Sequence, residues 1–332
     1  MAEISIFEDE AFGVVNLLTV INEEHALPGQ IASLGLFEEQ GVASTTVQIE
    51  KDGNVLALVP AAPRGGTGLA VIGDKRSLIP FNTVHLPQVF KILADEIQGI
   101  RAVGSTTELQ SAQAVVARRV EKARRQLDLT HEFQRIGATG GKVFDADGET
   151  VLLDIYQRFG LARPAVYSMG LGVPDTDVSE KCVAVLEAQE DALGNVTSTG
   201  AIALCGRTFW SKLIAHKNVR EAYLASEAAA QLRGDRRASF SFGGILWMRS
   251  LGRHAGEGFI ADDRARVIPE GVPELFISAF APADYMETVN TEGLPYYTKL
   301  ERMPFDKGVM GEAQSNPLHL CTRPLAVREL KI

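Results

Sequence analysis

The most regular pattern of apolar positions in the chain predicts one long helix. Its apolar positions recur every three or four residues and so share one helix face: Leu109, Ala112, Val116, Val120, Ala123 and Leu127. Ser105 and Glu108 stand at the two positions of a capping box, and no helix-breaking residue follows before Gly137. The predicted helix, residues 106–136, is about 45 Å long, which is longer than most helices of compact globular domains.

Alternating apolar and polar residues predict a β excursion over residues 40–86. Val47 and Ile49 alternate with polar neighbours, Asp52-Gly53 fits a hairpin turn, and the apolar run 55–59 returns. The glycine- and proline-rich stretch "AAPRGGTGLAVIGDKR" follows, and "SLIPFNTVHLP" is again strand-like. A lone two-stranded ribbon is marginally stable in water. We therefore expect these strands to pack against their own domain or against a neighbouring subunit.

Shorter patterns account for the rest of the chain. Residues 1–33 form a weakly patterned arm with one apolar piece, and Val89–Gly99 predicts a short amphipathic helix. "TVLLDIYQRFG" predicts a strand beside a short helix, and Ser179–Leu193 and Arg207–Gly234 predict two further helices. Strands are predicted in "RPAVYSMGLG" and "GAIALCG", as a pair in "ASFSFGGILWMRS", and in the last segment of the chain. This mixture predicts an α+β fold without internal repeats.

Composition narrows the class of protein. The chain has 332 residues, of which 45% are hydrophobic and 23% charged, as in soluble globular proteins of about two domains. The net charge of -9 argues against a protein that wraps nucleic acid with a basic face. The three cysteines include no CxxC pair, so we expect buried thiols in a reducing compartment. Neither a secretory signal nor a membrane helix is indicated.

The glycine-rich stretch "GATGGK" resembles a phosphate-binding loop only superficially. Such a loop needs G-x-x-x-x-G-K-[ST] after a strand and before a helix. Here Ile136 occupies the first glycine position, Val143 replaces the Ser/Thr, and a helix precedes the glycines. We interpret Gly137 as the end of the helix and Gly140-Gly141 as a turn. Asp145–Gly148 has one acidic residue too few for a calcium loop and no glutamate six residues after the glycine, so it fits a hairpin tip better.

Other candidate chemistry is weaker. In "SMGLGVPD", Asp175 stands where a dinucleotide fingerprint has its third glycine. The six histidines are scattered, and the closest approach to a site, His254 with Glu257, is read as a solvated loop. The long helix carries five basic residues, Arg118, Arg119, Lys122, Arg124 and Arg125. Because acidic residues interrupt them, we favour a solvated face with intrahelical ion pairs over a nucleic-acid contact. No catalytic, cofactor-binding or metal-binding residue is predicted.

Four stretches, in a fixed order along the chain, carry a family resemblance. "LVPAAPRGGTG" holds a proline-bearing segment with an Arg-Gly-Gly turn, "ILADEIQGIRAVG" leads into the long helix, and "GKVFDADG" follows that helix. In "AQSNPLHLCTRPLAV", a Ser/Asn-x-Pro-Leu run precedes the last strand. In kind and order these stretches resemble the lambda-type major capsid proteins of tailed phages, the major capsid protein E family, which has the Hong Kong 97-like coat fold.

The resemblance implies an α+β fold with five parts. These are an N-terminal arm (1–33), an extended β loop over a neighbour (34–84), a peripheral domain with a spine helix (85–160), an axial domain (161–295), and closing strands that return to the peripheral domain (296–332). Within the loop, it implies contacts between subunits at Arg64, Gly65, Gly66, Lys75 and Arg76.

The implied function is structural, without enzymatic activity or cofactor. Copies would form the hexamers and pentamers of an icosahedral virion shell, assembled in the host cytoplasm, which encloses DNA without sequence-specific binding or membrane contact. Scaffold, portal and decoration proteins are the implied partners. An acidic chain suits such a container, because phosphate contacts make DNA binding strong. Two alternatives remain, a nucleotide-dependent enzyme that uses the turn at 137–142 and an encapsulin-like nanocompartment shell.

Overall fold

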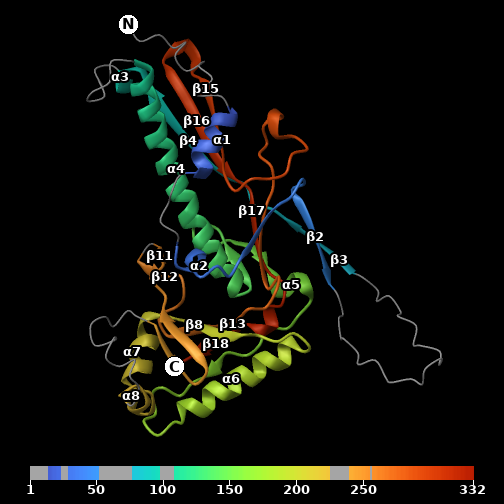
Figure 1. The fold of residues 1–332 in the computed structure, drawn as a ribbon, viewed down its shortest axis with the longest axis vertical. Coiled ribbons are helices and arrows are strands. Elements are labelled where there is room, and N and C mark those ends of the chain that lie inside the picture. Colours follow the sequence, from blue (N-terminus) through green and yellow to red (C-terminus); the bar gives the residue numbers. More distant parts are fainter. Residues whose placement is uncertain (1–13, 24–28, 52–76, 98–107, 225–238, 255) are drawn as a thin grey trace, which may run out of the picture.

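The computed structural model shows an elongated molecule of mixed helices and strands (Figure 1). The structure describes residues 14–23, 29–51, 77–97, 108–224, 239–254 and 256–332. One half is built along a long helix, and the other half on a six-stranded sheet at the opposite end of the long axis (Figure 1).

The six-stranded sheet has helices packed on one face. In spatial order its strands are β7 (Tyr167–Ser168), β18 (Arg328–Lys331), β13 (Arg264–Glu270), β8 (Gly200–Cys205), β10 (Ile245–Arg249) and β9 (Phe240–Phe242). The helices are α6 (Val178–Leu193), α7 (Arg207–Ala215) and α8 (Lys217–Leu224). Trp247 of β10 and Phe209 of α7 are fully buried between them. Nearly all of β8 is buried, as the apolar run "AIALC" predicts for a central strand.

The long helix α4 (Glu108–Thr139) has 32 residues and a length of about 48 Å. It packs against an antiparallel sheet of β15 (Tyr297–Arg302), β16 (Gly308–Ser315) and β4 (Leu86–Leu93), with α1 (Val14–Glu23) and α3 (Ala94–Ile97) beside it. The predicted apolar stripe is confirmed where its side chains are described: Val116, Val120, Ala123 and Leu127 are buried against Ile92 and Val309.

A third sheet lies beside the second half of α4 and links the two halves. It consists of β1 (Glu38–Gly41), β14 (Phe276–Phe280) and β17 (Pro317–Cys321). The short helix α2 (Gln30–Ser33) docks on α4 through Glu132, whose carboxylate accepts the N–H of Ile31 at 2.6 Å and of Ala32 at 3.3 Å. One hydrophobic cluster includes Ile136 of α4, Leu318 of β17 and Ile268 of the six-stranded sheet.

The smaller elements complete the chain. They are the ribbon β2 (Thr46–Lys51) and β3 (Ser77–Asn82), the hairpin β5 (Lys142–Phe144) and β6 (Val151–Asp154), α5 (Ile155–Phe159), the pair β11 (Arg253–His254) and β12 (Glu257–Gly258), and the 3-10 turns η3 (Met286–Thr288), η4 (Pro304–Asp306) and η5 (Pro324–Ala326). The predicted strand and short helix in "TVLLDIYQRFG" are confirmed, as are the helix over 179–193 and the strand pair β9–β10.

The predicted helix over Val89–Gly99 is wrong in its first half. Residues up to Leu93 belong to β4, and only Ala94–Ile97 are helical within the described residues. β4 pairs with β16 over its whole length, and exposure alternates, with Ile92 buried and Val89 exposed. Pairing with a distant strand therefore overrides the local helical pattern, as is common for strands.

The predicted end of the long helix is also displaced. The helix continues through Gly137 to Thr139, and the left-handed residue that follows it is Gly141, with φ of 79°. Gly137 is needed for another reason, because a Cβ there would lie 2.6 Å from the Lys142 carbonyl oxygen. The first glycine permits close approach of strand β5, and the last one turns the chain.

Two further expectations need correction. The helix predicted over Arg207–Gly234 is interrupted at His216, which has extended backbone angles, and residues 225–238 lie outside the described part. The His216 imidazole is buried, with Nε2 3.0 Å from the Val173 carbonyl oxygen, so packing dictates the break.

The closing segment 296–332 does not return to the peripheral domain as one unit either. β15 and β16 pair with β4, whereas β18 lies between β7 and β13 in the six-stranded sheet.

Candidate self-assembly surfaces

The predicted contact residues of the loop lie outside the described residues. Arg64, Gly65, Gly66, Lys75 and Arg76 all fall within 52–76, as does the predicted turn at Asp52-Gly53. The described part is the base of the loop, the ribbon of β2 and β3, which leaves the side of the body (Figure 1). β2 pairs with β3 from Thr46 opposite Asn82 to Lys51 opposite Ser77.

One face of the ribbon packs on the body. Val47 and Phe81 are buried, and the Phe81 ring lies 5.5 Å from that of Phe159 in α5. Ile49 and Ile79 lie on the same face and are partly buried against the same cluster, whereas Leu78 points to the opposite face and is 53% exposed. A two-stranded ribbon with an exposed apolar residue is not independently stable in water, so this segment is suited to lie on a second surface.

Pro80 removes a hydrogen-bond donor from one of the two ribbon edges. Thr83 N–H donates to the Thr45 carbonyl oxygen at 2.9 Å, which places the bonded pairs of the ladder at alternate positions. Pro80 lies at one of the other positions, where its nitrogen faces outward and the ladder loses no bond. The outer edge of β3 therefore lacks a donor in its middle, while the outer edge of β2 can still accept a strand.

Three of the basic side chains of α4 form ion pairs with carboxylates of the same chain. Arg119 pairs with Glu96 of α3 at 2.5 Å, Arg125 with Glu121, and Arg124 with Asp128. The last two are i,i+4 pairs, so the predicted intrahelical ion pairs are confirmed. A surface whose cations already have carboxylate partners has little charge left for phosphates.

The glycine-rich turn after α4 has no geometry for phosphate binding. The N–H of Gly141 donates to the Ala138 carbonyl oxygen at 3.0 Å, so it closes the helix instead of pointing into a cradle. The Tyr156 ring packs over Gly141 and fills the space that its missing Cβ leaves. Lys142 Nζ lies 3.2 Å from a carboxylate oxygen of Asp154. The nucleotide-dependent alternative therefore has no support in this turn.

The acidic turn that follows is a capped hairpin tip, as predicted. Asp147 accepts the N–H groups of Glu149 and Thr150, both at 2.9 Å, and the Thr150 hydroxyl at 2.6 Å. These bonds, the Thr150 hydroxyl first, lower the pKa of the Asp147 carboxyl. Gly148 takes the left-handed conformation, with φ of 76°. The carboxylate is satisfied by the turn itself.

The "GLG" stretch precedes α6, but the N-terminus of that helix is already occupied. The Asp177 carboxylate accepts the N–H of Ser179 at 2.9 Å and of Glu180 at 3.2 Å. An N-cap carboxylate satisfies the donors that would otherwise attract a pyrophosphate.

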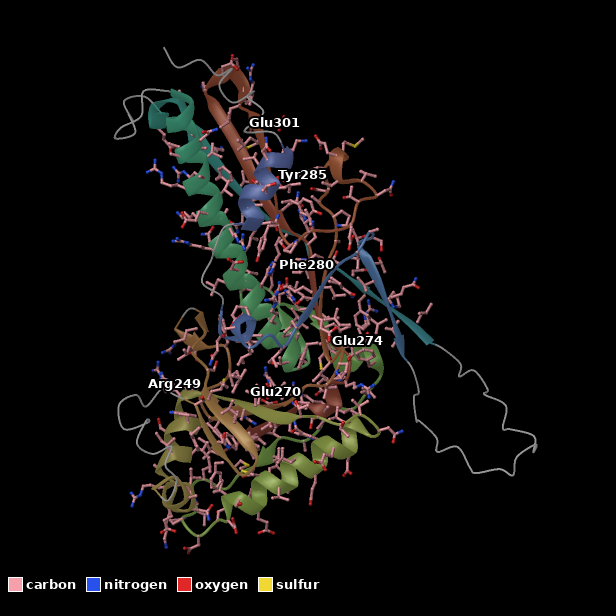
Figure 2. All side chains as sticks on the ribbon, viewed as in Figure 1. Arg249, Glu270, Glu274, Phe280, Tyr285 and Glu301 are labelled. Carbon is pink, nitrogen blue, oxygen red and sulfur yellow. The ribbon has the colours of Figure 1, made fainter. Side chains whose placement is uncertain are left out.

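Two buried histidines face each other between α4 and β17. The rings of His131 and His319 are 5.3 Å apart, and His131 stacks on Tyr296 and on Phe280 near the centre of the molecule (Figure 2). Burial, with Arg135 adding to it, lowers the pKa of His131 to about 3 and that of His319 well below its ordinary value. These rings are neutral members of an aromatic core. No group of three or more His, Cys, Asp or Glu side chains in the described ranges could hold a metal ion.

The three cysteines are buried free thiols, as the sequence predicts. Burial raises the pKa of Cys182 and of Cys321 to about 12 and that of Cys205 well above its ordinary value. Across the part of the chain that is described, no helix is both long and apolar enough to cross a membrane.

Sequence reasoning missed a face on the outer side of the β15–β16–β4 sheet where exposed apolar side chains lie among charged ones. Val89 and Leu93 of β4 are 59% and 42% exposed, and Met310 of β16, opposite Glu301, is 37% exposed. Glu301 marks this end of the molecule in Figure 2. At the neighbouring turn, Phe305 is 91% exposed and has a left-handed backbone, with φ of 62°. The alternation of residues 89–93 is the one signal that could have found this face.

Sequence reasoning also missed a cavity of about 670 Å³ beside the ribbon base. It lies among β3, β5, β6, α5, α4 and β17, and its lining includes Asn82, Val84, Gln134, Leu152, Arg158 and His319. These residues come from distant parts of the sequence, so no local pattern indicates the cavity.

Comparisons with known proteins identify the family of the chain. The family model described as phage major capsid protein E matches residues 13–332. The major capsid protein of Salmonella phage Felix O1 is 28% identical over 346 residues, covering 93% of this chain and 94% of that protein. The major capsid protein of Pseudomonas phage KPP10 is 30% identical over 290 residues, covering 81% and 82%.

A solved structure shows the same fold. The crystal structure of the protein proposed as capsid protein of an E. coli CFT073 prophage superposes with a TM-score of 0.57 at 12% identity, covering 96% of this chain and 98% of that one. The fold is thus the mixed α/β, Hong Kong 97-like capsid fold expected from the resemblance. The chain therefore belongs to the phage major capsid protein E family, and it is a structural, non-enzymatic protein of the virion that associates with its own copies into the capsid.

Proposed function

We propose that copies of this chain form the hexamers and pentamers of an icosahedral phage head that encloses double-stranded DNA without sequence-specific binding. The observation that carries the proposal is the ribbon of β2 and β3, which leaves the side of the body, packs on it through one face, and leaves Leu78 exposed on the other face. A ribbon of this kind needs a second surface, and heterologous contacts between identical subunits can close into rings.

Each part of the chain has a role in this proposal. Residues 1–33 serve as the arm, 34–84 as the extended loop across a neighbour, and 85–160 as the peripheral domain with α4 as its spine. Residues 161–295 form the axial domain around the centre of each capsomer, and β18 belongs to its sheet. The other closing strands, β15 and β16, belong to the peripheral domain through their pairing with β4.

Further proteins act with the shell in this proposal. A scaffold guides assembly, a portal occupies one vertex, and a decoration protein binds the finished surface. The net charge of -9 supports enclosure without tight binding of DNA, since a surface with excess negative charge does not displace the counterions of phosphates.

Negative-stain electron microscopy of the overexpressed protein tests the proposal. Capsomers, shells or tubes are expected, either from the protein alone or after co-expression with the scaffold. Persistent monomers under both conditions would refute it.

Deletion of Ala61–Asp74 tests the role of the loop. The variant is expected to remain folded by circular dichroism but to form no particles, because the loop supplies the contact with the neighbour. Particles of normal size and yield from this variant would show that the loop has another role.

A further inference from the structure

The tip of the β5–β6 hairpin contains a dipeptide that is chemically labile in an unfolded chain. Asp147-Gly148 is one of two Asp-Gly dipeptides in the sequence, the other being Asp52-Gly53, and the sequence has no Asn-Gly. At such a dipeptide the glycine nitrogen can attack the side-chain carboxyl carbon of the aspartate, because glycine has no side chain to obstruct the approach. Asp147 and Gly148 are exposed, so water also reaches this turn.

The reaction at an Asp-Gly dipeptide has two steps. The glycine nitrogen forms a bond to Cγ of the protonated aspartyl carboxyl, the carboxyl hydroxyl leaves as water with the amide proton, and a cyclic succinimide remains. Water then adds to one of the two ring carbonyls and opens the ring. Opening at the former backbone carbonyl leaves isoaspartate, in which the main chain runs through the side chain and is longer by one carbon.

The folded turn keeps the two reacting groups apart. One carboxylate oxygen of Asp147 accepts the N–H groups of Glu149 and Thr150, both at 2.9 Å, and the other accepts the Thr150 hydroxyl at 2.6 Å. These donors lie beyond Gly148, so they direct the carboxylate away from the nitrogen that would attack it. The Gly148 N–H donates to the Asp145 carbonyl oxygen at 2.9 Å, which fixes the orientation of that peptide group. Bond formation needs both groups in one near-attack geometry, and each is held elsewhere.

The same hydrogen bonds keep the carboxyl ionised. The Thr150 hydroxyl, followed by the N–H groups of Thr150 and Glu149, lowers the pKa of the Asp147 carboxyl because it stabilises the charged form. Ring closure needs the protonated acid, since a carboxylate has no hydroxyl that can leave as water. The short Thr150 bond is charge-assisted and is therefore stronger than a bond between neutral groups. Thr150 thus acts on both the position and the ionisation of the carboxyl.

Isomerisation at this tip would damage the structure that follows the long helix. The base of the hairpin pairs Lys142 with Asp154, and Ile155 N–H donates to the Gly141 carbonyl oxygen at 2.9 Å directly after α4. An additional main-chain carbon at the tip would break the turn that joins β5 to β6. The hydrogen bonds of the turn therefore protect the hairpin from a covalent change as well as stabilising its fold.

We propose that Asp147-Gly148 is a latent site of succinimide formation and isomerisation that the folded turn holds unreactive, with Thr150 as the positioning residue. The inference goes beyond the proposed function. It concerns the covalent chemistry of one subunit and does not depend on how copies assemble.

Ageing of the unassembled full-length subunit in mildly acidic buffer tests the proposal. Chromatography separates the aspartate and isoaspartate forms of the tryptic peptide 143–158, which have the same mass, and electron-transfer fragmentation locates the altered residue. We expect isoaspartate at Asp147 to form at least about tenfold more slowly in the folded subunit than in the chain unfolded in guanidinium chloride, because unfolding removes the bonds to the carboxylate. Equal rates in the folded and unfolded chains would overturn the proposal.

Two substitutions isolate the contribution of Thr150. Thr150→Val keeps the branched shape and removes the hydroxyl, whereas Thr150→Ser keeps the hydroxyl. In the folded subunit, we expect Thr150→Val to isomerise about three- to tenfold faster than the wild type and Thr150→Ser at nearly the wild-type rate. The rate should also fall with rising pH through a higher window in Thr150→Val, because its carboxyl stays protonated to higher pH.

Either of two results would refute the positioning role. One is a Thr150→Val subunit with the wild-type rate and pH profile, because the hydroxyl would then have no effect on the carboxyl. The other is a Thr150→Ser subunit that isomerises as fast as Thr150→Val, because the shape of the side chain and not its hydroxyl would then control the reaction.

Discussion

The pH dependence of stability offers a quantitative test of the buried histidine pair. His131 is fully enclosed between α4 and the sheet of β14 and β17, stacked on Tyr296 and Phe280, and neither ring nitrogen has a hydrogen-bond partner among the described residues. Arg135 and Arg124 face it from its own helix and His319 from β17, so the nearby charges also disfavour its protonation.

The sign and size of the effect follow from these surroundings. Burial, followed by the two arginines, lowers the pKa of His131 from 6.5 in the unfolded chain to about 3 in the folded protein. Between these values the unfolded chain binds a proton that the folded protein does not, so stability decreases as the pH falls through this window. With about 1.4 kcal/mol per pH unit, acidification from pH 7 to roughly 4.5 costs about 3 kcal/mol through His131 alone.

His131→Phe removes the proton site and keeps an aromatic ring for the stacks. Urea unfolding of the unassembled subunit, followed by far-ultraviolet circular dichroism, gives the free energy of unfolding at both pH values. We expect the wild type to lose about 3 kcal/mol more than the variant on acidification. His319 is present in both proteins, so its own contribution largely cancels. An equal loss in the two proteins would show that His131 is not a buried neutral histidine.

Three further substitutions test the local structure. Gly141→Ala places a Cβ against the Tyr156 ring at a left-handed position, so we expect a loss of about 2–4 kcal/mol in thermal denaturation. An unchanged or raised stability, as Gly→Ala gives at an ordinary helix position, would contradict the packing. Glu132→Leu leaves two N–H groups of α2 unpaired and should cost about 1–3 kcal/mol by calorimetry; an unchanged melting temperature would exclude this docking role. Lys142→Ala removes a partly exposed ion pair with Asp154, so stability should change by less than about 1 kcal/mol and particle yield should be normal. An ATP-induced rise in melting temperature that this last variant abolishes would instead support nucleotide binding.

Elements with local signals could be predicted from the sequence. The stripe through Val116 and Leu127 predicted α4, because one apolar face of a long helix is visible within a few turns. The turn at Asp147 was predictable for the same reason, since its hydrogen bonds close within four residues. The family resemblance added the capsid fold, which no local pattern of helices and strands specifies.

Features that depend on distant partners could not be predicted. The local pattern of Val89–Leu93 predicts a helix, whereas these residues form a strand because they pair with β16, far along the chain. The position of β18 inside the six-stranded sheet is likewise set by tertiary pairing. The glycines after α4 were recognised as a turn, but the close approach of Lys142 that requires Gly137 is visible only in three dimensions. The cavity at Gln134 and His319 joins six elements, and the loop contacts at Arg64 and its neighbours stay a prediction.

The buried thiols have a consequence for the particle after release from its host. Thiolates, not thiols, attack disulfides and react with oxidants, and Cys182, Cys205 and Cys321 are enclosed by packing with raised pKa values. A phage head passes from the reducing interior of a cell into aerated water and can stay there for long periods. With every cysteine of the chain shielded in this way, neighbouring subunits do not become linked by disulfides and no sulfinic or sulfonic acids build up. The cysteines of the shell therefore stay free thiols inside and outside the cell, and they do not make its stability depend on redox conditions.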